Sequence, residues 1–308
     1  MELHLVNRKL SQIGEWIALW GGCIFVFVMI FLCYAAAVFE ACPANGHDCD
    51  TVFWLGNFCV GQILLSLALF QYFSRFNCVS HWQRQSCVAD LCRHINELEE
   101  EHSEKVFGDR GKYCIDCNRE APLRSHHCPL CKICVLRKDH HCFVTGKCVG
   151  LGNQRFFMTF LFWCVLGLSY CLYELTLYIS SINDDLLPFG FVKLIGPFAI
   201  ARWMLSYTSL FDAAMCSLYT FAWASLVAAG GFLGLQIYYT CYGYTMYEYH
   251  SVTMREAFDG DGVSISERFR LVFGKNYLLN FFFPMFWEKP LLTPEIANNL
   301  FRVRSKLL

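Results

Sequence analysis

Charge is scarce in this 308-residue sequence. Asp, Glu, Lys and Arg make up 17% of the residues and the formal net charge is −1, whereas 56% of the residues are hydrophobic. The near-zero charge, and the lack of a basic stripe interleaved with aromatic residues, argue against a nucleic-acid-binding protein. Internal repeats and low-complexity segments are also missing, so a repeat architecture is not indicated. The apolar excess instead predicts a membrane protein with a modest polar part.

Four apolar runs are each long enough to cross a bilayer, for which a helix needs about 20 residues. They are roughly Trp16–Phe39, Val52–Phe73, Phe156–Ser180 and Cys216–Thr240. The first run is too long for the core of a signal peptide and lacks a small-residue cleavage site, so we expect it to remain as an anchor. The predicted fold class is therefore an all-α polytopic membrane protein with a four-transmembrane-helix bundle.

One more segment, Leu187–Phe211, is apolar enough to be a fifth span. Its two prolines and two cations favour an interfacial or re-entrant piece instead. A fifth span would carry the C-terminal tail across the membrane, and it stands as the alternative to the predicted four.

The distribution of basic residues predicts the orientation of the spans. With four spans, 23 of the 25 Lys and Arg residues share one side of the membrane, and only Lys193 and Arg202 lie on the other. The expected parts are a cytosolic N-terminus (1–15), transmembrane helices 1 and 2 (16–73), a cytosolic segment (74–155) with a Cys-rich domain at about 112–155, transmembrane helices 3 and 4 (156–240), and a cytosolic C-terminal tail (241–308).

Two features outside the spans can also be predicted. Cys42 and Cys49 lie in the first non-cytosolic loop, where a disulfide is possible, although two unpaired residues fit the pattern equally well. The stretch Cys92–Val106 has the composition of an exposed acidic helix.

The 19 cysteines are not spread evenly along the chain. Seven fall between Cys114 and Cys148, with histidines among them, and clustering at C-x2-C spacing is typical of metal binding rather than of a disulfide framework. This pattern also predicts a reducing compartment for the block. Two tetrahedral zinc sites need eight ligands. Six cysteines and two histidines would supply them if Cys142 is free, and seven cysteines and one histidine if it is not.

The neighbours of Cys142 favour a free thiol. Asp139, His140 and Cys142 offer an orienting carboxylate, a base and a nucleophile within four residues, and a thiol beside a histidine is readily ionised. The block ends at Cys148, about eight residues before the third span, so the thiol would lie close to the membrane surface. There it could meet a lipid thioester whose acyl chain lies in the bilayer.

This block resembles the DHHC family of protein S-acyltransferases (palmitoyltransferases). The resemblance rests on Cys114-x2-Cys117, on "PLRSHHC" at Pro122–Cys128, on C-x2-C-x2-C at Cys128–Cys134, on "DHHC" at Asp139–Cys142, and on "CVGLGNQRFF" at Cys148–Phe157. It implies a cytosolic zinc-binding Cys-rich domain between transmembrane helices 2 and 3. It also implies the transfer of a long-chain acyl group, chiefly palmitoyl, from acyl-CoA to cysteine thiols of target proteins.

Carried over residue by residue, the resemblance implies two structural Zn²⁺ ions and an acyl-enzyme. One ion would be held by Cys114, Cys117, His127 and Cys134, and the other by Cys128, Cys131, His141 and Cys148. Cys142 would be the nucleophile, His140 its base and Asp139 the orienting carboxylate. His126 would be an ordinary surface residue. The implied partners are acyl-CoA, membrane lipids and proteins with accessible cysteines, with no nucleic acid, in a Golgi or ER membrane.

The basic residues Lys138, Lys147 and Arg155 would be available to meet the phosphates of CoA, and contact with anionic lipid or water is the alternative for each.

The sequence departs from the family pattern at several positions. Phe143 and Val144 replace the usual Pro-Trp, Gly146 and Lys147 replace Asn-Asn, and Met246 replaces the second Thr of the family's Thr-Thr-x-Glu. In the tail, Arg268 replaces a usual Asn. All ligand and catalytic positions are intact, so we expect an active member. A catalytically inactive membrane adaptor is the alternative. A RING-type ligase would need a final C-x2-C pair, which the block lacks. A transporter would need more charge in the spans, which carry little besides Glu174.

Overall fold

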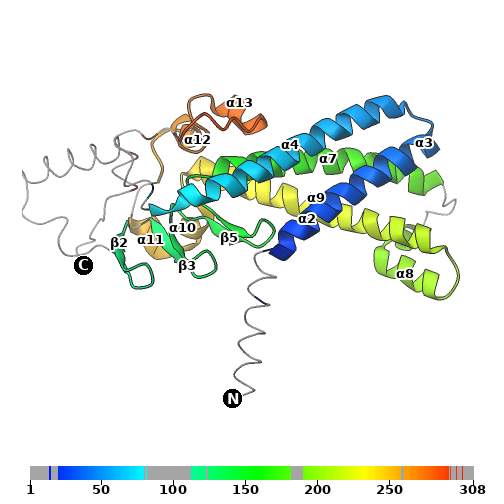
Figure 1. The fold of residues 1–308 in the computed structure, drawn as a ribbon, viewed down its shortest axis with the longest axis horizontal. Coiled ribbons are helices and arrows are strands. Elements are labelled where there is room, and N and C mark those ends of the chain that lie inside the picture. Colours follow the sequence, from blue (N-terminus) through cyan, green and yellow to red (C-terminus); the bar gives the residue numbers. More distant parts are fainter. Residues whose placement is uncertain are drawn as a thin grey trace, which may run out of the picture. The chain divides into compact units, whose positions relative to one another are not determined.

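The computed structural model describes residues 14, 20–79, 81, 112–122, 124–181, 190–257, 260–290, 292, 296 and 300. Within these residues, four helices are long and apolar enough to cross a membrane by their length and composition (Figure 1). They are Gly22–Asn45, Cys49–Asn77, Gln154–Ser181 and Leu210–Tyr242. The predicted number of spans therefore agrees with the structure. The expected acidic helix Cys92–Val106 lies outside the described residues.

The helices run further than the apolar runs of the sequence. The first consists of α2 (Gly22–Ala35), the π-helical η2 (Ala36–Ala41) and α3 (Cys42–Asn45), which ends six residues beyond the predicted Phe39. The others consist of α4 (Cys49–Phe73) with the 3-10 turn η3 (Ser74–Asn77), α7 (Gln154–Ser181) and α9 (Leu210–Tyr242). The extensions have a simple cause, because helical hydrogen bonding continues into polar residues that an apolar-run criterion leaves out.

Two compact units divide the chain. The bundle unit comprises residues 24–65 and 160–233, and the Cys-rich unit comprises residues 1–23, 66–159 and 234–308. In the bundle unit, Cys33, Ala36 and Ala37 of the first helix pack with Leu175 of α7 and Ala222 of α9. Small side chains at this core let helix backbones approach closely, which is the usual way that helices associate in a membrane.

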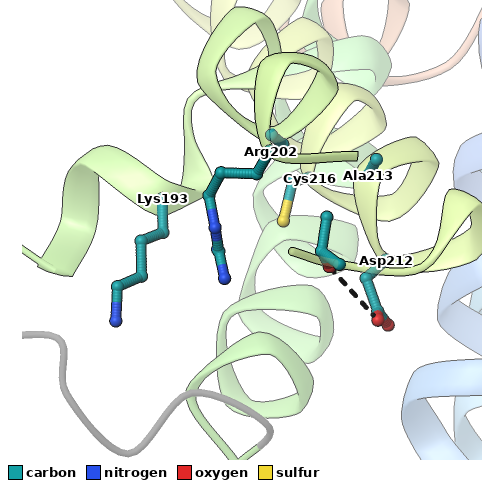
Figure 2. A pocket seen from close by; sticks show the side chains of 7 residues that line it. Lys193, Arg202, Asp212, Ala213 and Cys216 are labelled. Carbon is teal, nitrogen blue, oxygen red and sulfur yellow. Dashed lines mark hydrogen bonds between the residues drawn. The ribbon is translucent and has the colours of Figure 1, made fainter. Parts of the chain in front are cut away.

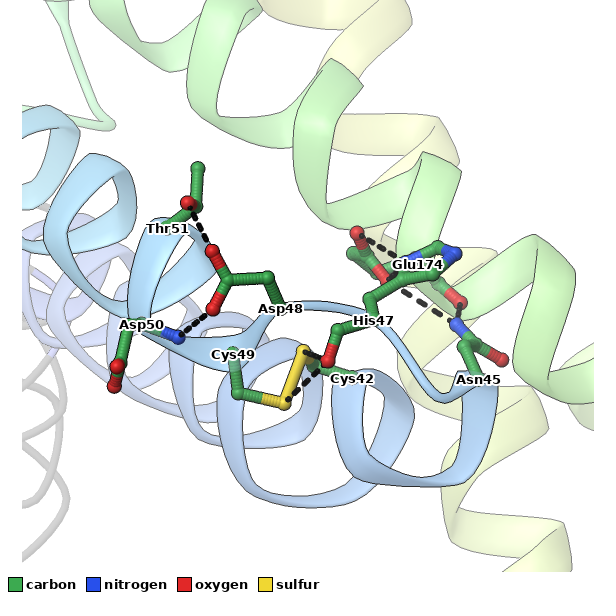
Figure 3. The surroundings of a disulfide bond; sticks show 8 residues. All are labelled: Cys42, Asn45, His47, Asp48, Cys49, Asp50, Thr51 and Glu174. Atoms are coloured by element: carbon green, nitrogen blue, oxygen red, sulfur yellow. Dashed lines mark hydrogen bonds and ion pairs between the residues drawn. A yellow bond between two sulfur atoms is a disulfide. The ribbon is translucent and has the colours of Figure 1, made fainter.

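The loop between the first two membrane helices is closed by a disulfide between Cys42 and Cys49 (Figure 3). Beside it, the buried carboxylate of Glu174 accepts from Asn45 Nδ2 at 3.1 Å and lies 3.1 Å from His47 Nδ1. Of the two possibilities that the sequence left for the cysteine pair, the structure has the disulfide. The charged residue of the third span, Glu174, is therefore stabilised by contacts with Asn45 and His47 of this loop region.

The segment proposed as a possible fifth span contains no helix of sufficient length in its described part. It forms a short 3-10 helix, η4 (Gly190–Leu194), and the nine-residue helix α8 (Gly196–Met204). Nine helical residues span about 13.5 Å, less than half of the hydrocarbon core of a bilayer. Residues 187–189 of the segment lie outside the described residues.

The Cys-rich unit contains β structure, so the all-α prediction is wrong for this part of the chain. Three two-stranded antiparallel sheets pair β1 (Lys112–Cys114) with β2 (Arg119–Ala121), β3 (Ser125–Cys128) with β4 (Ile133–Leu136), and β5 (His140–Cys142) with β6 (Lys147–Val149). Strands of three or four residues carry too little periodic pattern to be recognised in the sequence.

The C-terminal part of the Cys-rich unit is helical. It contains α10 (Met246–His250), α11 (Val252–Ala257), α12 (Ile265–Phe273) and α13 (Tyr277–Phe282). Helices α10 and α12 each begin with a capping box, Thr245 with Glu248 and Ser264 with Glu267. Leu271 of α12 lies in one core with Leu136 of β4 and Leu151, so the tail and the Cys-rich strands share a hydrophobic core.

A buried ion network joins the same two parts. Arg124 donates to Glu248 at 2.7 and 2.8 Å and to Asp261 at 2.7 Å. Arg137 donates to the other oxygen of Asp261 and to Gln154. None of the four charged side chains is more than 1% exposed. Each buried guanidinium therefore has a carboxylate partner, which offsets the cost of removing it from water.

Candidate active site and metal centres

The first cluster of potential metal ligands is built by the β1–β2 turn and the β3–β4 hairpin. It contains Cys114, Cys117, His127 and Cys134, whose ligand atoms all lie within 4.8 Å of one another. His127 and Cys134 are directly opposite each other in the β3–β4 register. Directly opposed residues on antiparallel strands point to the same face, which is why these two side chains meet the Cys114/Cys117 knuckle.

The second cluster repeats this construction one hairpin later. It contains Cys128, Cys131, His141 and Cys148. Here the knuckle lies in the β3–β4 turn, and the other two ligands are the opposed pair His141 and Cys148 of β5 and β6. The residue after each knuckle, Asn118 or Lys132, has a positive φ, of 48° and 56°. Both knuckles therefore turn the chain in the same way.

The spacing of the donor atoms within both clusters fits a tetrahedral zinc ion. Bonds of about 2.3 Å to sulfur and about 2.0–2.1 Å to nitrogen require S···S separations of about 3.8 Å and S···N separations of about 3.5 Å. The Sγ–Nδ1 distances that involve His127 and His141 are 3.3 to 3.6 Å. The Sγ–Sγ distances are 3.5 Å for Cys117–Cys134 and 3.7 Å for Cys131–Cys148. Both clusters are therefore compatible with metal binding.

Strand β5 separates the residues of the DHHC sequence. Successive side chains of a strand point to opposite faces, so His141 faces Cys148 and the second cluster, while His140 and Cys142 share the other face. On that face His140 Nδ1 lies 2.6 Å from Asp139 Oδ2. The three groups that could perform acyl transfer are thus brought together on the side away from the metal ligands.

Asp139 is held by more than its histidine. Its side chain is buried, Gln236 Nε2 of α9 donates to Oδ2 at 2.7 Å, and the backbone N–H of Met246 donates to Oδ1 at 2.7 Å. Gln236 Oε1 accepts from Gln154 Nε2 at 2.9 Å, and Gln154 in turn accepts from Arg137. A continuous chain of hydrogen bonds therefore connects the buried ion network to Asp139.

The surroundings shift the pKa values of all three groups. Burial raises the pKa of the Cys142 thiol, but interactions with His140 and Thr145 outweigh burial, and the net pKa is lowered. Burial lowers the pKa of His140, but Asp139 and Cys142 raise it to about 9. Burial raises the pKa of Asp139, whereas His140, Met246 N–H and Gln236 lower it more strongly. This is the electrostatic pattern of a thiolate beside an imidazolium that a carboxylate orients.

The divergent segment after Cys142 lies against the ends of two membrane helices. The carbonyl oxygen of Thr145 accepts from Cys23 Sγ at 3.1 Å and from Gln71 Nε2. Gly22 lies so close that a Cβ there would overlap the carbonyl oxygen of Phe143 and come within 2.7 Å of Val144 Cα. The backbone of the segment is therefore packed, whereas the side chains of Phe143 and Val144 are 60% and 44% exposed.

Gly22→Ala is expected to destabilise the protein by about 1–3 kcal/mol, because the added methyl group forces the helix and the 143–147 segment apart. The thermal midpoint of the detergent-solubilised protein checks this. Gly61→Ala in α4 is the matched control, since a Cβ there meets nothing within 4 Å. Removal of a helix-interior glycine should leave the midpoint unchanged or raise it. Equal midpoints for the two variants would contradict the close approach at Gly22.

Other residues singled out in the sequence have distinct positions. His126 is not a surface residue, since it is 7% exposed and its ring lies 4.1 Å from that of Tyr247. Lys138 Nζ donates to the His127 carbonyl at 3.1 Å. Arg155 is 3% exposed and donates to the Glu288 carbonyl, so burial keeps it from meeting CoA phosphates. Lys147 is partly exposed.

Comparison with known proteins agrees with this arrangement. Residues 108–252, which contain both Cys₃His clusters and the Asp139, His140 and Cys142 group, match the family model described as DHHC palmitoyltransferase. This match to a family model confirms the resemblance seen in the sequence.

Three similar proteins show how far the likeness extends. Human probable palmitoyltransferase ZDHHC24 is 48% identical over 55 residues, which are 18% of this chain and 19% of that protein. Zebrafish (Danio rerio) palmitoyltransferase ZDHHC16A is 28% identical over 162 residues, 51% and 37% of the two chains. Arabidopsis thaliana probable protein S-acyltransferase 12 is 35% identical over 112 residues, 35% and 37%. The chain thus spans less than two fifths of the length of each of these relatives.

Two residues that hold the site were missed in the sequence. Gln236 lies inside an apolar run of α9, where a single amide is unremarkable until the helix is seen beside Asp139. Asn77, buried at the end of η3, donates to the Cys148 carbonyl at 3.1 Å and to Asn153 Oδ1 at 2.9 Å. A polar residue within or just after a membrane span was the signal that could have identified both.

Proposed function

We propose that this chain is a protein-cysteine S-acyltransferase that transfers a long-chain fatty acyl group, palmitoyl by resemblance to the family, from acyl-CoA to thiols of target proteins. The observation that carries the proposal is the division made by strand β5. Its central residue, His141, faces three thiols, while His140 and Cys142 face the other way with Asp139 2.6 Å from the imidazole. The preference for palmitoyl rests on the family resemblance alone.

The proposed reaction has two steps that use the same three residues. In the first, His140 takes the proton of Cys142, the thiolate attacks the thioester carbonyl of acyl-CoA, and the CoA thiolate leaves and takes up the proton. In the second, His140 takes the proton of a substrate cysteine, whose thiolate attacks the thioester of acyl-Cys142, and His140 returns the proton to the departing Cys142 thiolate. Asp139 keeps the imidazole in the tautomer that can accept a proton at Nε2.

Zinc has a structural role in this proposal. Cys114, Cys117, His127 and Cys134 would hold one ion, and Cys128, Cys131, His141 and Cys148 the other. Four protein ligands per ion leave no open coordination position for a substrate. The ions would instead tie three short hairpins together and so fix the strand that carries His140 and Cys142.

The surroundings of Cys142 support an apolar acyl substrate. The ring of Phe157 lies 5.5 Å from that of His140, and Phe70 lies 5.8 Å from Phe157. Phe143 and Val144 present exposed apolar side chains directly after the nucleophile. Each buried CH₂ contributes about 0.8 kcal/mol, so burial of an acyl chain would supply most of the binding free energy.

We propose that the Cys-rich domain and both termini lie in the cytosol, with the protein in a Golgi or ER membrane. Metal-binding thiolates persist in a reducing compartment, and a disulfide such as Cys42–Cys49 persists in an oxidising one. The two kinds of cysteine lie in loops that four spans put on opposite sides. The shared core of Leu271 with Leu136 further supports a tail on the same side as the Cys-rich domain.

One experiment tests the enzyme against the alternative of an inactive zinc-containing adaptor. The purified protein is incubated with labelled palmitoyl-CoA, and bound label and zinc are measured for the wild type, Cys142→Ser and the matched control Cys78→Ser. We expect a hydroxylamine-sensitive label on the wild type and on Cys78→Ser, none on Cys142→Ser, and two zinc ions per chain in all three.

Each departure from this result has its own meaning. Loss of one zinc ion from Cys142→Ser would make Cys142 a metal ligand and refute its role as nucleophile. Zinc without label in the wild type would favour the adaptor. Equal labelling of the wild type and Cys142→Ser would show that the acyl group is attached to a different thiol.

A further inference from the structure

The short helix α8 of the bundle unit has its polarity reversed relative to a water-facing helix. Its aromatic and long apolar residues are exposed, with Phe198 at 53%, Trp203 at 41% and Met204 at 73%. Its one basic residue, Arg202, is partly buried. Exposed apolar patches mark a surface that meets something other than water. In a chain with four membrane-spanning helices, a short amphipathic helix of this kind fits the membrane interface, where Trp and Tyr are enriched.

A polar pocket lies under this helix (Figure 2). Its volume is about 150 Å³, and it is lined by Lys193, Ala199, Arg202, Thr208, Asp212, Ala213 and Cys216. Figure 2 shows the side chains of Lys193 and Arg202 extending in the same direction, from η4 and α8. These are the two Lys or Arg residues between the third and fourth spans, so all of the basic charge of that loop lies in one pocket.

The two cations are not neutralised by the acidic residue of the pocket. Asp212, in the first turn of α9, accepts from Ser209 Oγ at 2.7 Å and from Thr208 Oγ1 at 3.5 Å. In the part of the chain that the structure describes, neither Lys193 nor Arg202 forms an ion pair. The lining that the structure describes therefore has more positive than negative charge.

The pocket is held in place by its own packing. The backbone N–H of Gly196 donates to Thr220 Oγ1 at 2.8 Å, and Thr220 donates to the Leu194 carbonyl at 3.2 Å. A Cβ at Gly196 would come within 3.1 Å of Ser217 Cα, so α8 lies close against α9. Ala199 packs with Ala213 and Cys216 beneath the cations. The site is therefore built by the fold and does not depend on two mobile surface side chains.

We propose that this pocket binds the phosphate of a membrane phospholipid, with the acyl chains of the lipid lying along the exposed apolar side of α8. An Arg guanidinium binds phosphate through paired donors, and a Lys ammonium adds a point charge. The volume corresponds to about five water molecules, which is room for a phosphate group but not for a whole lipid. The apolar exposure of α8 is what assigns the phosphate to a lipid rather than to a soluble anion.

Native mass spectrometry of the full chain in detergent, titrated with phosphatidylglycerol, tests the proposal. We expect Lys193→Gln/Arg202→Gln to raise the apparent Kd about tenfold to thirtyfold, since each basic side chain near an anionic lipid headgroup changes the affinity about threefold to fivefold. The matched control Arg255→Gln/Lys275→Gln removes the same charge from exposed positions in the tail and should change Kd less than twofold. Equal effects of the two double variants would overturn the assignment.

Two further measurements keep the test decisive if the double variant is poorly folded. Asp212→Asn removes a negative charge from the pocket but keeps an acceptor oxygen, so it should tighten phosphatidylglycerol binding, and unchanged or weaker binding would contradict the proposal. Inorganic phosphate at millimolar concentration should leave the bound lipid in place. Displacement of the lipid by inorganic phosphate would identify the occupant as a soluble anion instead.

Discussion

Asp261→Ala is expected to lower the free energy of unfolding of the Cys-rich unit by about 3–5 kcal/mol, because it leaves buried guanidinium charge without its carboxylate. Arg137 loses its ion-pair partner altogether, while Arg124 keeps Glu248. The thermal midpoint and zinc release of the solubilised protein measure the effect. The double variant Asp261→Ala/Arg137→Leu should be less destabilised than the single one, since it removes the uncompensated charge as well.

The same ion network has a predictable pH dependence. Burial raises the pKa of Asp261, but Arg124 and Arg137 lower it further, so the folded-state pKa lies below the ordinary value. A carboxyl group with a lowered pKa stabilises the fold above its unfolded pKa of about 3.9 and loses that contribution as the pH falls through the folded pKa. The difference in stability between the wild type and Asp261→Ala should be constant from pH 7 to about pH 5 and shrink below about pH 4. A difference that is already lost at pH 6 would contradict the lowered pKa.

Asp139→Asn is expected to slow acylation of Cys142 by about 10³- to 10⁴-fold, the size that loss of the correct imidazole tautomer has in triad enzymes. Asp139 Oδ1 accepts the Met246 N–H, so an asparagine would keep its oxygen there and turn its NH₂ toward His140. The imidazole would then accept at Nδ1 and carry its proton at Nε2, where it could no longer take the proton of a thiol. Single-turnover labelling with palmitoyl-CoA measures the rate.

Two further variants are measured beside Asp139→Asn. Asp50→Asn, at an exposed carboxylate in the first turn of α4, should leave the rate unchanged. Gln236→Leu removes one hydrogen bond to Asp139 but leaves its charge, so we expect an intermediate loss of about tenfold, the effect of roughly one charge-assisted hydrogen bond. Zinc content should match the wild type in every variant. A rate for Asp139→Asn within tenfold of the wild type would remove Asp139 from the mechanism.

The membrane part of the fold can be predicted from the sequence because a span must be predominantly apolar over its whole length in the hydrocarbon core. Long apolar runs therefore identify Gly22–Asn45 and its three counterparts, with errors confined to ends such as the six residues beyond Phe39. The Cys-rich strands are different. Their pairing follows from where ligands meet in space, and three-residue strands such as β5 contain less than two periods of pattern.

The candidate site shows the same limit. Spacing alone left open whether Cys142 was a ligand, and a resemblance was needed to assign His140 and His141 to different roles. The contacts of Asp139 with Gln236 and Met246 join residues that are 97 and 107 positions apart in the sequence. No local pattern predicts such contacts, because they depend on how α9 and the chain beyond it return to the Cys-rich strands.

Neighbouring residues of β5 have different roles because their side chains point alternately to the two faces of the strand. An insertion of one residue between His140 and Cys142 would turn the thiol toward the metal ligands and leave His140 without its nucleophile. An insertion of two would return the thiol to the face of His140, but about 7 Å further along the strand. The reactive thiol is therefore kept apart from the metal-binding thiols by its position in the alternation of β5.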